Sequence, residues 1–179
     1  KATEQDKLSL FTQEYINQYG KVVDETIEFE KGTDKKILTD DLVKAKEVFN
    51  QLIEKSPSAE NYFYLGNAYL VQFEPNFDKA KEAFDKGIAL DSKSYLNKIG
   101  LATIKLGKGQ KASAITELTQ VAKESKEKDA EVLYRIGEAL TMFENNNDPA
   151  LAITYINKAI EKAQKYGVPA YYYYTLGDA

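Results

Sequence analysis

The sequence predicts an all-α protein, an α-solenoid in which pairs of antiparallel helices repeat in tandem. Two interleaved series of small residues support this prediction. Apolar-Gly pairs recur at glycine spacings of 34, 37 and 40 residues: Leu65-Gly66, Ile99-Gly100, Ile136-Gly137 and Leu176-Gly177. Between them, an alanine followed four residues later by a large apolar residue recurs at spacings of 35, 34 and 38: Ala45/Phe49, Ala80/Phe84, Ala114/Leu118 and Ala152/Ile156. Two series with nearly one period indicate a repeated two-helix unit, because glycine and alanine let helices approach closely.

Residues 1–38 do not fit the repeat. Phe11, Tyr15 and Tyr19 lie near helical spacing, and 31–36 is a polar segment with glycine. We therefore expect a divergent first helix over 4–30 that caps the solenoid, followed by a loop over 31–36. A strand within 21–30 is the alternative, because its apolar residues partly alternate.

The rest of the chain is divided by clear turn signals, among them Pro75-Asn76, Gly107–Gly109 and Asn145–Asn147. Asp148 followed by Pro149 is typical of a helix start, because aspartate caps free N–H groups and proline fits the first helical position. The expected helices span 40–55, 59–73, 77–90, 93–106, 110–126, 129–144 and 149–166, and another starts at 169. The single domain 1–179 then consists of 1–38, the second helix of a first unit (39–58), units 59–92, 93–128 and 129–168, and the start of a further unit (169–179).

These motifs resemble the tetratricopeptide repeat (TPR) family. Tyr62-x2-Leu65-Gly66-x2-Tyr69 followed by Ala80-x3-Phe84 matches the family pattern almost position for position. The two later units match more weakly, and their spacing from glycine to alanine is longer than is usual in the family. The resemblance covers about residues 40–179 and implies a right-handed solenoid.

In TPR proteins the first helices of successive units line a concave groove that holds an extended peptide or a partner helix. Aromatic side chains would supply contact area there, and amides would pair with a ligand backbone. For the apolar positions, the alternative is that they complete the core. Carried over to this chain, the groove positions are Phe63, Asn67, Leu70, Asn97, Leu101, Ile104, Tyr134, Glu138, Thr141, Tyr171 and Tyr174.

Some TPR proteins grip the C-terminal carboxylate of a chaperone with a set of lysine, asparagine and arginine residues. Asn67 and Arg135 match that set, whereas Phe63, Lys98 and Glu131 do not. Glu131 would repel a carboxylate, so we do not expect this clamp.

Composition excludes several kinds of chemistry. The chain has no cysteine and no histidine, which excludes disulfides, thiolate ligands and imidazole bases. It has no phosphate-binding or nucleophile motif, so we expect no enzyme activity, catalytic residue, cofactor or metal. The net charge of −4 argues against nucleic acid as a partner, and the apolar stretches are too short for a transmembrane segment.

The expected function is a non-catalytic scaffold that binds a protein or peptide of unknown identity. The alternative is a structural or self-assembly segment of a larger repeat protein with no free ligand. Tyr171–Tyr174 and Leu176 are apolar where a capping helix would be polar, so we expect a longer protein or self-association through this last unit. Within the tyrosine run, the family pattern places Tyr173 in the core.

The composition also bears on origin. Of the 24 basic residues only Arg135 is arginine, and Lys, Asn, Ile and Tyr are heavily used, which is typical of an AT-rich bacterial genome. Together with the absence of cysteine and of an initial methionine, this favours the bacterial periplasm or cell envelope over the cytoplasm.

Overall fold

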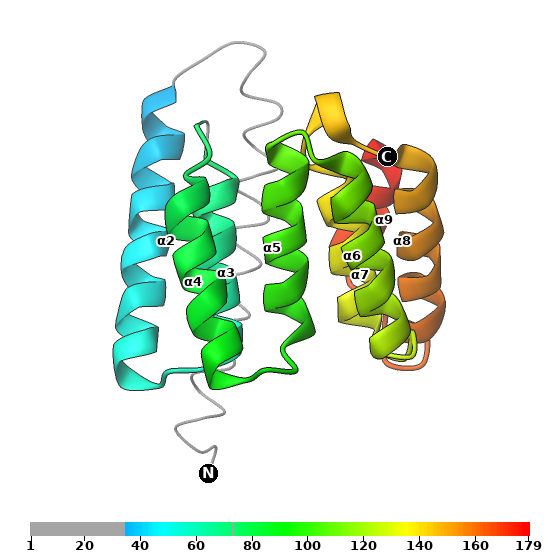
Figure 1. Cartoon of the computed structure of the whole chain (residues 1–179), viewed down its shortest axis with the longest axis horizontal. Coiled ribbons are helices and arrows are strands. Elements are labelled where there is room, and N and C mark those ends of the chain that lie inside the picture. Colours follow the sequence, from blue (N-terminus) through cyan, green and yellow to red (C-terminus); the bar gives the residue numbers. More distant parts are fainter. Residues whose placement is uncertain (1–34, 73) are drawn as a thin grey trace. The chain divides into compact units, whose positions relative to one another are not determined.

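The computed structural model describes residues 35–72 and 74–179, which form eight α-helices and one short 3-10 helix (Figure 1). The chain divides into two compact units, residues 1–51 and 52–179, and each is described by itself. The predicted helix at 4–30 lies outside the described residues. Helix α2 (Lys35–Lys55) begins earlier than the predicted start at residue 40, so the predicted loop over 31–36 is wrong at its last two positions. Within the first unit, α2 buries Leu42, Ala45 and Phe49, which lie on one side of the helix.

The second unit is a series of helices packed in sequential, antiparallel-like pairs. Helix α3 packs with α4, α5 with α6, and α7 with α8. The alternate helices α3, α5, α7 and α9 also contact one another in that order. The bounds are α3 (Ala59–Leu70), α4 (Phe77–Leu90), α5 (Tyr95–Gly107), α6 (Lys111–Glu124), α7 (Ala130–Thr141), the 3-10 helix (Glu144–Asn146), α8 (Pro149–Ala163) and α9 (Ala170–Asp178). The prediction of an all-α protein built of sequential helix pairs is confirmed for the described residues, and the solenoid geometry stays a prediction.

Polar side chains cap several helix starts, and the start that the sequence predicts at Asp148 and Pro149 is confirmed. The hydroxyl of Ser58 accepts a hydrogen bond from the backbone N–H of Asn61 at 3.1 Å, and the side chain of Asn76 accepts one from Lys79 at 3.1 Å. Asp148 accepts one from the N–H of Leu151 at 3.2 Å, and α8 begins at Pro149. Each cap satisfies a backbone donor that would otherwise lack a partner.

Four helices, α3, α6, α7 and α8, end two or three residues earlier than predicted, and local turns follow α7 and α8. Helix α7 gives way to the 3-10 helix, and the N–H of Asp148 returns to the carbonyl of Leu140 at 2.9 Å. After α8, Gly167 takes a positive φ of 90°, which favours glycine and redirects the chain. Helix α3 ends at Leu70 and α6 ends at Glu124, before the predicted ends at residues 73 and 126.

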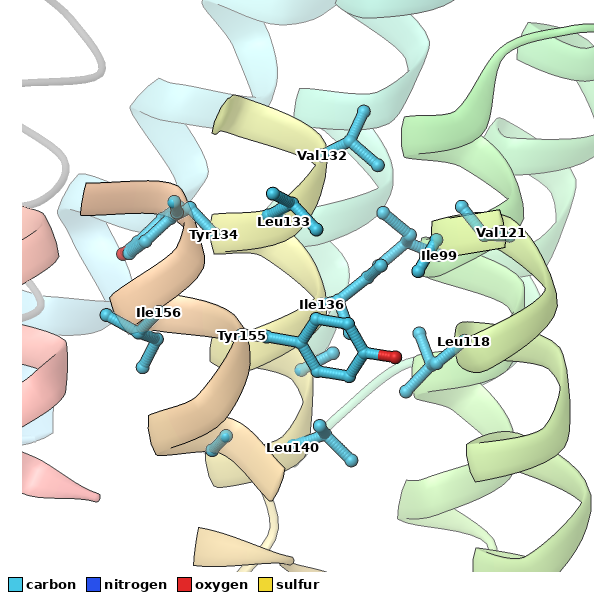
Figure 2. Packing of buried hydrophobic residues seen from close by; sticks show 14 of the residues in the cluster. Ile99, Leu118, Val121, Val132, Leu133, Tyr134, Ile136, Leu140, Tyr155 and Ile156 are labelled. Atoms are coloured by element: carbon cyan, nitrogen blue, oxygen red, sulfur yellow. The ribbon is translucent and has the colours of Figure 1, made fainter. Parts of the chain in front are cut away.

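Small residues lie where the helices pack most closely. A Cβ atom added at Gly66 or at Gly100 would overlap the ring of Phe84, and one added at Gly137 would overlap Ile156. The alanines of the second series, Ala80, Ala114 and Ala152, are completely buried. Ala114 and Ala152 belong to one core of α5 to α8 (Figure 2), whose large apolar side chains are Ile99, Leu118, Val121, Val132, Leu133, Tyr134, Ile136, Leu140, Tyr155 and Ile156. Ala80 lies in a second cluster with Phe63, Leu70, Phe84 and Ile104. None of the helices in the described ranges is long and apolar enough to cross a membrane.

We predict that Ala80→Leu lowers the free energy of unfolding by roughly 1–3 kcal/mol, because a larger side chain would overpack a fully buried site. Ala89→Leu is the matched control, since Ala89 is exposed in the same helix. Urea unfolding followed by far-UV circular dichroism measures both. Equal stability of the two variants would contradict the packing described for α4.

Candidate binding surface

The predicted groove residues divide into buried and accessible groups. Phe63, Leu70, Asn97, Ile104 and Tyr134 are buried. Asn67, Leu101, Glu138, Thr141 and Tyr171 are half-buried, and Tyr174 is exposed. In this structure only the second group offers its side chains to a ligand.

Phe63, Leu70 and Ile104 pack together in one apolar cluster, with Leu101 and Met142 against it. These residues come from α3, α5 and the end of α7, so the cluster joins three of the alternate helices. The buried members support this surface from beneath, as the core alternative for the apolar positions describes.

Asn97 is held inside the protein. Its Nδ2 donates hydrogen bonds to the carbonyl of Ala59 at 2.7 Å and to the hydroxyl of Ser94 at 2.8 Å. A Cβ at Gly87 would overlap the Asn97 amide, so glycine is what lets α4 approach it. In the described part of the chain, its Oδ1 is the one buried side-chain nitrogen or oxygen atom without a hydrogen-bond partner. The amide therefore ties α5 to the start of α3 rather than facing a ligand.

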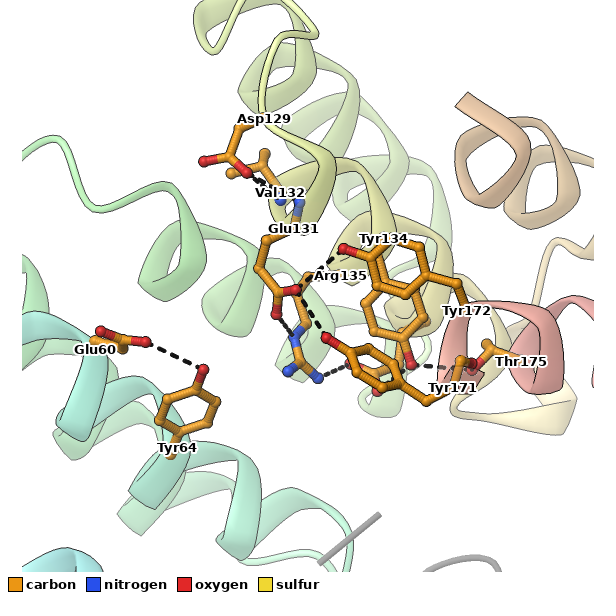
Figure 3. Close-up of polar contacts among 11 residues, drawn as sticks. Glu60, Tyr64, Asp129, Glu131, Val132, Tyr134, Arg135, Tyr171, Tyr172 and Thr175 are labelled. Atoms are coloured by element: carbon orange, nitrogen blue, oxygen red, sulfur yellow. Dashed lines mark hydrogen bonds and ion pairs between the residues drawn. The ribbon is translucent and has the colours of Figure 1, made fainter. Parts of the chain in front are cut away.

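Two of the accessible residues, Glu138 and Tyr171, belong to a polar cluster centred on Arg135 of α7, which is only 8% exposed. Its Nε donates to Glu131 at 2.7 Å and its Nη1 donates to Glu138 at 2.8 Å (Figure 3). The two carboxylates lie four residues before and three residues after the arginine, which places all three side chains on one face of the helix. One guanidinium between two carboxylates leaves a formal charge of −1.

Three tyrosines complete this group. The hydroxyls of Tyr171 and Tyr172 in α9 both donate to Glu131 at 3.2 Å, and the hydroxyl of Tyr134 donates to Glu138 at 3.1 Å. The rings of Tyr134 and Tyr172 stack with centroids 4.3 Å apart and planes 4° from parallel. We call Glu131, Tyr134, Arg135, Glu138, Tyr171 and Tyr172 the Arg135 cluster. It fixes α9 to α7.

Aromatic rings of α3 also approach the guanidinium. Its central carbon lies 5.6 Å from the ring centroid of Phe63 and 6.0 Å from that of Tyr64, and Tyr134 of α7 lies at 5.3 Å. At such distances the face of an aromatic ring attracts a cation. Arg135 thus links α3, α7 and α9 in one network.

Burial changes the acid–base properties of the Arg135 cluster. Burial raises the pKa of Tyr134 well above its ordinary value, and the charge of Glu138 adds to this. The pKa values of Tyr171 and Tyr172 are raised by burial and by Glu131. Burial alone would lower the pKa of Arg135, but Glu138 and Glu131 outweigh it and raise that pKa. At neutral pH the tyrosines therefore remain donors and Arg135 remains charged.

Two sequence-based expectations bear on this region. Arg135, which matches one position of the chaperone clamp, is engaged by the chain's own carboxylates, and the absence of such a clamp stays a prediction. The placement of Tyr173 in the core is wrong: Tyr172 is buried, and Tyr173 is 54% exposed. The stack on Tyr134 sets the rotation of α9 and turns Tyr173 outward.

Arg135 was not among the predicted groove residues, although one signal for it was available. It is the only arginine among 24 basic residues, and glutamates stand on both sides at helical spacing. Arginine forms several directed hydrogen bonds at once, which lysine cannot match. Its partners in α3 and α9 are too distant in sequence for spacing alone to identify them.

No model of a known protein family matches the chain, and no curated protein matches it either. Within 35–72 and 74–179, the acidic residues form no group that could hold a metal ion.

We predict that Arg135→Gln lowers the free energy of unfolding by roughly 2–4 kcal/mol. This is somewhat less than for a fully buried ion pair, because Glu131 and Glu138 keep about 30% of their surface in solvent. Lys86→Gln, which removes the exposed ion pair with Glu82, should leave the free energy of unfolding nearly unchanged, because water and salt screen an exposed pair. Chemical unfolding curves of the two variants test this. Similar losses in both would contradict a central role for Arg135.

Stability should also decrease in alkali. The unfolded chain releases tyrosine protons near pH 10, whereas the folded protein holds those of the Arg135 cluster. The unfolded state therefore binds fewer protons above about pH 10. Below that pH the ionisation of these tyrosines does not change the free energy of unfolding. Above it, their ionisation in the unfolded chain lowers the free energy of unfolding as the pH rises.

The Tyr134→Phe variant removes one such proton. Above about pH 10 its free energy of unfolding should therefore fall less steeply than that of the parent chain, and the two slopes should differ by about 1.4 kcal/mol per pH unit. Urea unfolding between about pH 8 and pH 11 gives the slopes, with Tyr166→Phe as the control substitution at an exposed site. Identical slopes for the parent chain and Tyr134→Phe would contradict the assignment.

Proposed function

We propose that this chain is a non-catalytic scaffold that binds a protein or peptide on the surface formed by α3, α5 and α7. The observation that supports it is the ordered contact of these alternate helices, with accessible residues of different chemistry on a buried apolar base. In the TPR resemblance, the first helices of successive units line the ligand groove of a right-handed solenoid. The proposal extends that arrangement to this chain.

The accessible residues suit an extended peptide. Asn67 offers an amide that can both donate to and accept from a peptide backbone. Leu101 offers an apolar contact between α3 and α7, and Glu138 offers a carboxylate. These side chains belong to helices already fixed by the core, so little ordering is required when a ligand binds.

Charge suggests which peptides are favoured. The Arg135 cluster has one positive and two negative groups, and the chain carries a net charge of −4. A peptide with lysine or arginine near Glu138 would be attracted, and an acidic peptide would be repelled. In this proposal the chain performs no reaction, and its selectivity comes from the preorganised surface.

A displayed library of random peptides, selected against the immobilised chain, tests the proposal. We expect enrichment of basic and apolar peptides. Their affinity, measured by fluorescence anisotropy, should fall at least about tenfold in an Asn67→Ala/Leu101→Ala variant. The control is Thr116→Ala/Gln120→Ala, which alters exposed residues of α6.

Circular dichroism must show that both variants keep the helical content of the parent. Failure to enrich any peptide would contradict the proposal. So would peptides that bind the two variants equally well, because their site would then lie elsewhere.

A further inference from the structure

Helix α9 has an exposed face that the Arg135 cluster does not use. Tyr172 is buried in the core, and Tyr171 and Leu176 pack against it. Ala170, Tyr173 and Gly177 are exposed, and their spacing of three and four residues places them on one side of the helix. This side carries the large ring of Tyr173 and, four residues further along, the backbone of Gly177, which has no side chain to cover it.

At the other helical glycines that the structure describes, side chains of neighbouring elements cover the backbone. The ring of Phe84 lies against both Gly66 and Gly100, and the rings of Phe77 and Phe143 lie against Gly107. Ile156 covers Gly137, and Asn97 covers Gly87. Among the helical glycines that the structure describes, Gly177 alone has no atom within 4 Å of the place that a Cβ would take. An aromatic ring on a bare glycine is thus a contact that this chain already uses.

We propose that a second copy of this chain covers the face, with the two α9 helices packed antiparallel about a two-fold axis. The ring of Tyr173 in each copy would lie on the backbone of Gly177 in the other. A two-fold interface requires one surface that carries both halves of each contact. Tyr173 and Gly177 supply these two halves, one helical turn apart.

The size of the face sets the expected strength. A helix of nine residues is about 14 Å long, so the interface is smaller than the roughly 1,200 Å² of a stable complex. The dimer should therefore be weak and concentration-dependent. Each copy carries a net charge of −4, so higher salt should strengthen the association by screening the repulsion.

Sedimentation equilibrium of the full chain from about 5 to about 500 µM tests the proposal. We expect a monomer–dimer equilibrium that is weakened at least about tenfold by Tyr173→Ser and by Gly177→Ala. Tyr166→Ser is the matched control, because Tyr166 is 91% exposed and lies outside α9. It should associate like the parent.

The Gly177→Ala variant separates the interface from the fold. Alanine favours helix and meets no neighbour within one chain, so α9 should become no less stable while the place of the partner's ring is filled. Three results would overturn the proposal: a monomer at all concentrations, a dimer unaffected by both variants, or growth beyond dimers. Peptide binding at Asn67 and Leu101 should be unchanged in both α9 variants, so failure here leaves the proposed scaffold function to its own test.

Discussion

The contact of one phenylalanine ring with two glycines governs how the second unit is built. Phe84 of α4 lies against the backbone of Gly66 in α3 and of Gly100 in α5. Because neither glycine has a side chain, the ring fits where these helices approach it, and α3 and α5 also contact each other. That approach brings Asn67 and Leu101 onto neighbouring helices. The proposed peptide surface thus depends on a buried contact that no ligand touches.

Further along the chain, a buried charged group, the guanidinium of Arg135, determines how α7 and α9 pack together. Arg135 holds two carboxylates of its own helix, and these carboxylates receive the hydroxyls of tyrosines from α7 and α9. Leaving any of these groups unpaired in a buried setting costs free energy, so the network favours one position of α9. The same position turns Tyr173 and Gly177 toward solvent. The polar network and the proposed contact between copies are therefore consequences of one helix orientation.

Much of the helix pattern could be predicted from the sequence, because it depends on neighbours close in the chain. Asp148 and Pro149 mark a helix start by local chemistry, and α8 begins there. Gly66 and Phe84 belong to adjacent helices of one predicted unit. Asn97 and Tyr172 could not be placed in this way, because the bond of Asn97 to Ala59 and the stack of Tyr172 on Tyr134 join segments far apart in sequence. Five of the eleven predicted groove residues are buried.

The stack of Tyr134 on Tyr172 also gives the molecule a natural optical reporter. The chain contains no tryptophan, so its near-ultraviolet signal comes from tyrosine and phenylalanine. Two nearly parallel rings 4.3 Å apart couple their electronic transitions, and one ring belongs to α7 while the other belongs to α9. Near-ultraviolet circular dichroism therefore contains a signal specific to the docking of α9. Local detachment of this helix can be followed without any label while the far-ultraviolet signal of the other helices persists.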